Sequence, residues 1–167
     1  MPLAVTVHPI DPDFDRWDDL LALIREAFAF MEGVVDPPSS AQQLTVEGLR
    51  DKALAETGLV VFDGPRIIGC AFLAERQDHV YLGKLAVAKD YQGQGIGRAL
   101  VRHAEGLAVR AGKPAIVLQT RIELTGNHAA FGRLGFIKTA ETAHPGYDRP
   151  TSITMRKTLA AGAGPTG

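Results

Sequence analysis

The sequence lacks the features that mark secreted, membrane-spanning and metal-binding proteins. It has one cysteine, Cys70, so no disulfide can form within the chain. No apolar run is long enough to cross a bilayer, and the N-terminus lacks the basic start and apolar stretch of a signal peptide. His79 and His103 lie far apart in the sequence, with no zinc-ligand spacing around them. We therefore expect a cytoplasmic protein with no metal site and no membrane partner.

The charge balance excludes another class of partner. The formal net charge is -1, which gives no general attraction to nucleic acid, so we expect no nucleic-acid partner. Hydrophobic residues make up 46% of the chain and charged residues 22%, as in ordinary globular proteins. A chain of 167 residues suits one domain with a buried core. We expect this domain to span residues 1–158 and the small-residue stretch 159–167 to be a flexible tail.

Hydrophobic periodicity in the first half predicts two helices and then a group of strands. Apolar residues recur at three- and four-residue steps over 17–31, which predicts a helix with Asp13 or Asp15 as its N-cap. A second helix is predicted over 45–56, with Thr45 as its cap. A short strand is expected before the helices and an antiparallel meander of three strands after them, at 3–10, 58–64, 66–76 and 79–88.

The second half alternates strands and helices. A long helix over 96–111 separates the strand at 79–88 from an apolar strand at 115–120. This order is a crossover connection, so the two strands should be parallel. A short helix and two further strands complete the chain, at 125–134, 135–141 and 151–159. The fold class is therefore α/β, with a mixed sheet flanked by helices.

The stretch "DYQGQGIGRALV", residues 90–101, places three glycines directly before the long helix. A helix N-terminus has unpaired N–H groups and a partial positive charge, and glycines let a diphosphate reach those amides. A Walker A loop is excluded because Arg98 and Ala99 follow Gly97, where Lys and Ser or Thr are required. The dinucleotide fingerprint is also a poor match, because Arg98 stands where its third glycine belongs.

Residues 85–101, "LAVAKDYQGQGIGRALV", resemble the acetyl-coenzyme A motif of the GNAT superfamily of N-acetyltransferases. That motif is Q/R-x-x-G-x-G/A between a strand and a helix, and Gln92, Gly95 and Gly97 match it position by position. The preceding "KLAV", the later "FGRLGF" and the order of elements are also similar to that family, over residues 1–158.

The resemblance implies a GNAT-like fold and acetyl-CoA as co-substrate. Such a fold has a mixed, mostly antiparallel sheet, in which a parallel strand pair is splayed around the coenzyme site. Pantetheine would bond the exposed strand edge as an added strand does. The coenzyme-binding residues implied are Leu85, Ala86 and Val87 at that edge, the amides of Gln92, Gly93, Gln94, Gly95, Ile96, Gly97 and Arg98, and the flanking Asn127 and Phe131. Asn127 could instead cap its short helix.

The chain departs from the family pattern in its acid and base groups. Phe131 stands where many members have a tyrosine acid, and Lys84 is the only charged residue on a strand that often carries a glutamate. A thiol with a pKa of about 8.5 still leaves as thiolate, so loss of the acid need not abolish transfer. The candidate bases are Glu75, Glu32 and Tyr147, with His144 beside Tyr147 and a water chain as a rival. An N–H near Val87 would stabilise the oxyanion.

The acceptor is expected between the loops at 31–40 and 144–151. Glu32, Asp36 and Asp148 would attract a cationic amine, whereas Arg149 would hold a carboxylate. This combination favours an amino-acid-like or small polyfunctional amine. The expected function is acetyl transfer to a primary amine of a small molecule. The alternatives are a protein lysine or N-terminal acetyltransferase and a non-catalytic coenzyme A-binding module. The sequence also leaves a homodimer open.

Overall fold

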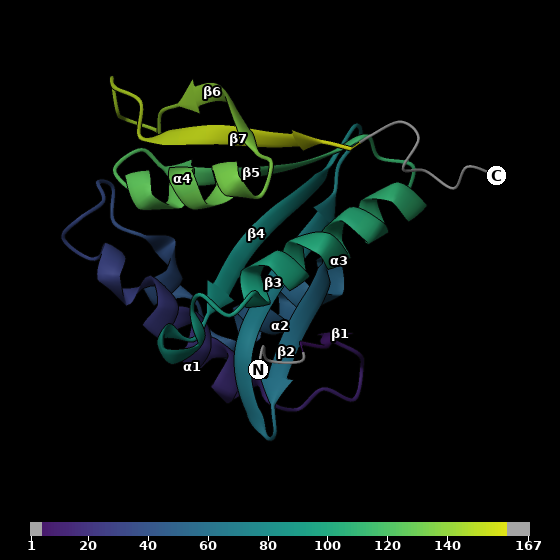
Figure 1. Cartoon of the computed structure of the whole chain (residues 1–167). Helices are drawn as coiled ribbons and strands as arrows, with labels where there is room; N and C mark the ends of the chain where they lie inside the picture. The colour runs from purple at the N-terminus through teal and green to yellow at the C-terminus, as the bar shows by residue number, and fades with distance from the viewer. Residues whose placement is uncertain (1–4, 160–167) are drawn as a thin grey trace.

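The computed structural model describes residues 5–159 and has a central sheet with the strand order β1-β2-β3-β4-β5-β7-β6 (Figure 1). Its strands are β1 (Val7–Pro9), β2 (Thr57–Asp63), β3 (Arg66–Glu75), β4 (Val80–Val87), β5 (Ala115–Arg121), β6 (Ile137–Thr142) and β7 (Ser152–Thr158). Its α-helices are α1 (Trp17–Phe28), α2 (Val46–Ala55), α3 (Ile96–Arg110) and α4 (Thr125–Arg133), and three short 3-10 helices are η1 (Ala29–Met31), η2 (Ser40–Gln43) and η3 (Lys89–Tyr91).

Strands β1 to β4 pair antiparallel in chain order, which confirms the predicted meander. The turn between β2 and β3 places Gly64 at a φ of +58°, a conformation that favours glycine. The first strand is shorter than the predicted 3–10, since pairing with β2 involves only Val7–Pro9, and residues 3 and 4 lie outside the described part. The expected flexible tail also lies outside it, apart from Leu159.

Strands β4 and β5 are parallel, as the crossover predicted, but they pair only at Val80 with Ile116 and at Tyr81 with Val117. Beyond this point they separate (Figure 1). A bulge lies just past the separation, where Lys84 and Leu85 of β4 face the single residue Ala71 of β3. Lys84 has a φ of 49°, in the left-handed region. The second half of β4 is therefore left without a partner on its β5 side.

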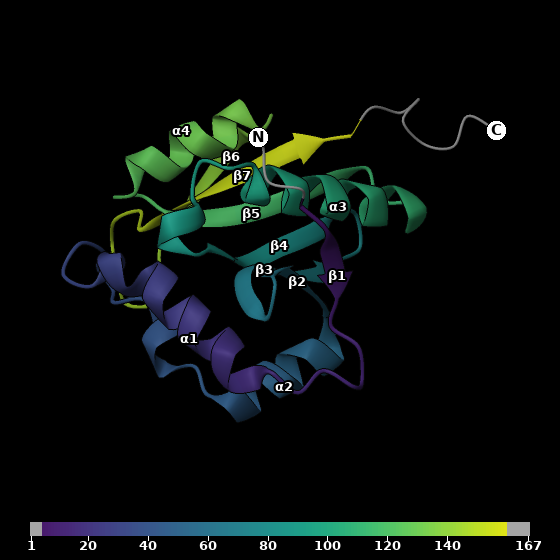
Figure 2. The same ribbon diagram turned by 60° about the horizontal axis from the view of Figure 1, so that its bottom comes forward.

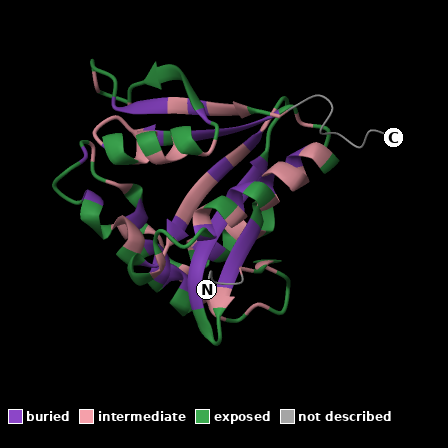
Figure 3. Cartoon of the chain, viewed as in Figure 1, coloured by how far each residue is buried: buried purple, intermediate pink, exposed green. Residues whose placement is uncertain are grey.

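Helices α1 and α2 cover one face of the sheet, and α3 covers the other (Figure 2). Both long helices bury the centre of their predicted apolar stripes. The buried residues are Leu20, Leu21, Leu23 and Ile24 in α1 and Ile96, Leu100, Val101, Ala104 and Ala108 in α3. Leu23 and Val101 were not predicted, and Ala111 at the end of the predicted α3 stripe is exposed. The helix predicted over 17–31 is α-helical to Phe28 and continues as η1. Burial is concentrated in β2, β3 and the core-facing sides of these helices, whereas β6 is exposed along its length (Figure 3).

Of the two predicted N-caps, that of α2 is confirmed and that of α1 is wrong. Thr45 caps α2, because its hydroxyl accepts the Gly48 N–H at 3.0 Å. The predicted cap of α1 by Asp13 or Asp15 is wrong, since the capping residue is Arg16 and makes no side-chain cap bond. Asp11 instead accepts the Asp13 N–H at 2.9 Å in a local turn before the helix.

The thiol of Cys70 is expected to be chemically silent in the folded protein. The residue is fully buried, and burial raises the pKa of the thiol to about 12. At pH 8 the thiolate fraction is then on the order of 10⁻⁴, and only the thiolate reacts. A disulfide reagent should therefore detect no thiol in folded protein and one per chain in denaturant. Rapid reaction of the folded protein would contradict this expectation.

Candidate functional site

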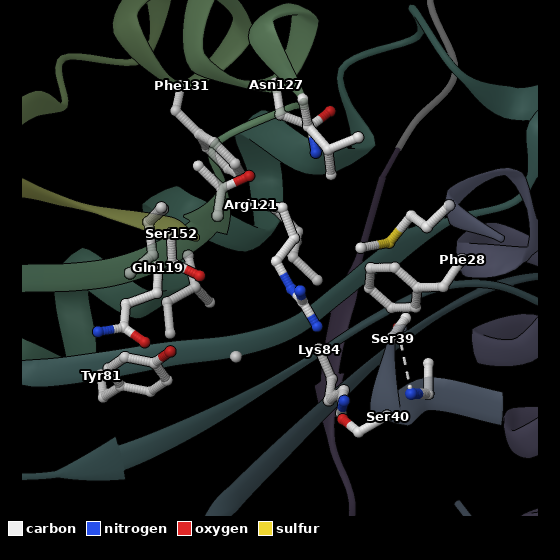
Figure 4. A pocket seen from close by; sticks show the side chains of 18 of the residues that line it. Phe28, Ser39, Ser40, Tyr81, Lys84, Gln119, Arg121, Asn127, Phe131 and Ser152 are labelled. Atoms are coloured by element: carbon white, nitrogen blue, oxygen red, sulfur yellow. Dashed lines mark hydrogen bonds between the residues drawn. The ribbon is translucent and has the colours of Figure 1, made fainter. Parts of the chain in front are cut away.

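A cavity lies where β4 and β5 separate (Figure 4). Its volume is about 390 Å³. Its walls come from β4 at Tyr81–Leu85, from β5 at Leu118–Arg121 and from α4 through Asn127 and Phe131. Phe28 at the end of α1 closes another side, together with Met31, Ser39, Ser40 and Ala41 of the segment between α1 and α2. The lining is completed by Lys52, Leu124, His144 and Ser152. The cavity thus connects the helix α4 side of the molecule with the α1–α2 side.

The glycine loop leads from β4 through η3 into α3 and is open at its surface. Gly93 and Gly95 have φ values of +81° and +87°, and Gly95 is the N-cap of α3. A Cβ atom added at Gly93, Gly95 or Gly97 would meet nothing within 4 Å. The first helical bond is Ala99 N–H to Gly95 O at 3.0 Å, so the amides of residues 96–98 have no partner within the helix. This is an open amide cradle that suits a pyrophosphate.

Side-chain bonds fix the start of this loop. Arg66 donates two hydrogen bonds to Asp90, at 2.8 and 2.9 Å, and Tyr91 donates its hydroxyl to Asp63. The bond from Arg66 holds the pKa of the Asp90 carboxyl below its usual range. The loop is therefore anchored to the β2–β3 hairpin before it reaches the glycines.

The other residues predicted to bind coenzyme lie on both sides of the opening. The second half of β4, including Leu85, faces the gap without a β5 partner, and Leu85 lines the cavity. Asn127 and Phe131 reach into the cavity from α4 (Figure 4). The alternative role of Asn127 as a cap is wrong, because the capping position of α4 is Leu124 and no side chain bonds there. Phe131 also packs edge-on against Phe136, with ring centroids 5.9 Å apart.

The three acids and phenols predicted as bases do not line this cavity. Glu75 lies exposed at the end of β3, opposite Val80, and Glu32 lies exposed just after η1. The hydroxyl of Tyr147 donates to Asp36 at 2.7 Å, and this bond raises the pKa of the phenol. Tyr147 is thus engaged by a carboxylate outside the cavity.

His144 is the candidate base that does line the cavity. Its ring Nδ1 bonds to the hydroxyl of Thr151, and its backbone N–H donates to the same oxygen at 2.9 Å. Thr151 is fully buried, so the partner that orients the imidazole is itself fixed. The second ring nitrogen, Nε2, has no partner of its own among the described residues.

The two loops expected to form the acceptor walls are joined to each other. Asp36 accepts from Tyr147 at 2.7 Å and from Arg149 at 2.8 Å, and its own N–H donates to Glu123 at 3.1 Å. Arg121 of β5 donates to the carbonyl oxygens of Pro37 and Pro38, at 2.6 and 3.1 Å. We expected Asp36 to attract an amine and Arg149 to hold a carboxylate of the acceptor. In the structure these two charges pair with and neutralise each other. We call this set of contacts the loop clamp.

Sequence patterns did not reveal the basic side chains of the cavity. Lys84, Arg121 and Lys52 all line it, and its lining within residues 5–159 contains no acidic side chain. Burial lowers the pKa of the Lys84 ammonium, with smaller contributions from Lys52 and Arg121. Tyr81 also lines the cavity, and burial raises the pKa of its phenol. Lys84, the only charged residue on the β4 strand, was the one sequence feature that could have indicated this charge. The bulge that positions Lys84, however, depends on pairing with β3.

Comparisons with known proteins agree with this geometry. The acetyltransferase (GNAT) family model matches residues 17–136. The chain is similar to N-alpha-acetyltransferase MAK3 of Arabidopsis thaliana, at 34% identity over 64 residues, which are 38% of this chain and 34% of that protein. It is also similar to N-alpha-acetyltransferase 30 of Schizosaccharomyces pombe, at 30% identity over 89 residues, which are 50% of this chain and 59% of that protein. The matched part of the chain thus spans about a third of one relative's length and about three fifths of the other's.

A solved structure supports the fold. The PaiA N-acetyltransferase of Thermoplasma acidophilum, in complex with coenzyme A, matches with a TM-score of 0.79 at 16% identity, covering 94% of this chain and 100% of that chain. This likeness confirms the predicted GNAT-like sheet with its splayed parallel pair. No helix among residues 5–159 is long and apolar enough to cross a membrane. With the family model matching most of its length, from Trp17 to Phe136, the chain belongs to the acetyltransferase (GNAT) family.

Proposed function

We propose that this protein transfers the acetyl group of acetyl-CoA to the primary amine of a small molecule, by direct attack of the amine. The observation that carries the proposal is the cavity between β4 and β5. Its lining includes Leu85 of the free β4 edge and Arg121, one of the residues of the loop clamp. The acceptor would enter from the α1–α2 side, and the clamp would limit its size.

The predicted coenzyme residues each receive a role in this proposal. The amides from Gln92 to Arg98 hold the pyrophosphate, and the free edge at Leu85–Val87 bonds the pantetheine arm. Asn127 and Phe131 flank that arm from α4. Bound acetyl-CoA supplies the acetyl group as a thioester. An N–H near Val87 donates to its carbonyl oxygen, where negative charge develops.

The proton of the attacking amine goes to His144 in this proposal. The amine must lose a proton to react fully, and a positioned imidazole is the commonest acceptor of such a proton. His144 lines the cavity and is oriented by Thr151, whereas Glu75, Glu32 and Tyr147 lie outside it. Phe131 offers no acid, so the coenzyme leaves as its thiolate.

A protein N-terminus is the second candidate acceptor, because both curated relatives are named N-alpha-acetyltransferases. The two candidates are separated by measuring coenzyme A release with a thiol reagent, since Cys70 is expected to stay silent. A panel of small primary amines is compared with short peptides that have free N-termini. Preference for the small amines supports the proposal, and preference for peptides favours the second candidate. Acetyl-CoA binding without transfer to either panel would favour a non-catalytic module.

The loop clamp gives a matched mutational prediction. Asp36→Ala removes the acceptor of both Tyr147 and Arg149, so the two loops lose the side-chain bonds that join them to each other. We expect the KM for a small amine to rise roughly 10-fold, because a loosened wall no longer orients the acceptor. The affinity for acetyl-CoA should be unchanged in calorimetry. Asp51→Ala is the control, since this exposed carboxylate of α2 makes no side-chain bond within the described residues and does not line the cavity. Equal effects of the two variants would count against the clamp.

A further inference from the structure

The acceptor half of the cavity carries positive charge that the protein itself does not neutralise. Lys84 enters from β4, Arg121 from β5 and Lys52 from α2, and Figure 4 shows Lys84 and Arg121 pointing into the same space near Phe28. The cavity lining within residues 5–159 includes no carboxylate. A half-buried cavity of this kind favours a ligand that brings negative charge.

The three cations differ in what they contact. Lys52 bonds to Glu56 at 2.9 Å, so its charge is paired. Arg121 donates to two neutral carbonyl oxygens, which fix its direction but leave its charge unbalanced. Lys84 has no hydrogen bond from its ammonium and no carboxylate within 4.0 Å among the described residues, and it lies only over the ring of Phe28, at 5.9 Å. Lys84 and Arg121 are thus the cations available to a ligand.

The surroundings of Lys84 disfavour its charged form. Burial and two like charges all oppose the charged form of Lys84, and they lower its pKa. An entering anion reverses this balance, because charge-assisted hydrogen bonds in a desolvated site are stronger than neutral ones. Ser39 adds a donor, because its oxygen already accepts the Ala41 N–H at 3.2 Å and its hydroxyl proton stays free to point elsewhere. The site therefore combines two cations and a hydroxyl.

The phosphates of the coenzyme do not account for these cations. Their proposed cradle lies at the N-terminus of α3, and none of residues 92–98 lines the cavity that Lys84 and Arg121 enter. Lys84 lies over Phe28 of α1, and Arg121 bonds to the loop that follows α1. The unbalanced charge thus faces the acceptor rather than the pyrophosphate.

We propose that the acceptor is a primary amine that also carries a carboxylate or a phosphate group, and that Lys84 and Arg121 hold this anion. This inference rests on the proposed function and names the substrate class of the same site. It places the anion at the β4–β5 opening on the α1–α2 side, next to the loop whose carbonyl oxygens Arg121 bonds.

Matched acceptors test the inference. γ-Aminobutyrate is compared with butylamine, and phosphoethanolamine with ethanolamine, at saturating acetyl-CoA. We expect the anionic member of at least one pair to show a kcat/KM about 10-fold or more above its neutral partner, and the better pair identifies carboxylate or phosphate. Lys84→Met should lower kcat/KM for that anionic acceptor about 10- to 100-fold and change the neutral one little. Lys138→Met, at an exposed ion pair on β6, is the control for lost charge.

A binding measurement keeps the inference testable if none of these amines is a substrate. Butyrate and inorganic phosphate are titrated by calorimetry into protein loaded with coenzyme A. Binding of either anion that Lys84→Met weakens about 10-fold or more, and Lys138→Met does not, supports the inference. Two results would overturn the inference while the proposed acetyl transfer stands. One is an equal kcat/KM for neutral and anionic amines. The other is equal affinity of wild type and Lys84→Met for the anions. Failure to bind acetyl-CoA at all would instead overturn the proposed function.

Discussion

Replacing Gly95 with arginine is expected to abolish measurable acetyl-CoA binding without unfolding the protein. Gly95 has a φ of +87°, which other residues adopt at a cost of roughly 1–2 kcal/mol. The new side chain would occupy the open space that adjoins the free amides of residues 96–98. Loss of two charge-assisted bonds, at about 1.5–3 kcal/mol each, corresponds to at least about 100-fold weaker binding.

Gly112→Arg is the matched control for this result. Gly112 follows the other end of α3, has a φ of +75°, and also has nothing within 4 Å of an added Cβ. The two variants share the backbone strain, so a difference between them reports on the site. Calorimetry should show acetyl-CoA binding to wild type and Gly112→Arg but not to Gly95→Arg, with similar melting temperatures for both variants. Unchanged affinity of Gly95→Arg for acetyl-CoA would show that the pyrophosphate does not bind at this loop.

Local sequence rules account for the features that were predicted correctly. The Thr45 cap, the β2–β3 turn and the stripe of α3 each depend on residues within a few positions of one another. The parallel pairing of β4 and β5 followed from the order strand, helix, strand. The glycine loop was recognisable because its function requires consecutive backbone groups, which adjacent residues supply.

The missed features depend on contacts between distant parts of the chain. The bulge at Lys84 arises from the pairing of β3 with β4, and nothing in "YLGKLAV" itself requires it. Arg121 gains its place in the cavity by bonding carbonyl oxygens more than eighty positions earlier in the chain. The sequence alone gives no sign that Asp36 and Arg149 form an ion pair, because the fold brings together two loops that are far apart in the chain. The predicted bases Glu32 and Tyr147 failed for the same reason. Both belong to loops that were expected to flank the acceptor, but the fold leaves their side chains outside the cavity.

Replacing His144 with glutamine is expected to lower kcat about 100-fold, at the lower end of what a positioned general base contributes. Glutamine keeps hydrogen-bonding atoms near Thr151 but cannot take a proton from the amine. The KM for the acceptor and the affinity for acetyl-CoA should change little, because the imidazole acts on the proton rather than on binding. Assays of coenzyme A release with both acetyl-CoA and the acceptor at saturating concentrations give kcat directly.

Two further measurements separate proton transfer from a structural effect of the change. His144→Ala should regain activity when imidazole is added to the assay, because a small base can occupy the space that the side chain leaves. His103→Gln is the control, since this half-buried histidine of α3 does not line the cavity. A kcat within a few-fold of wild type in His144→Gln would show that water carries the proton. The imidazole would then serve to hold the loop beside Thr151, and the chemistry would depend on how Lys84 and Arg121 orient the amine.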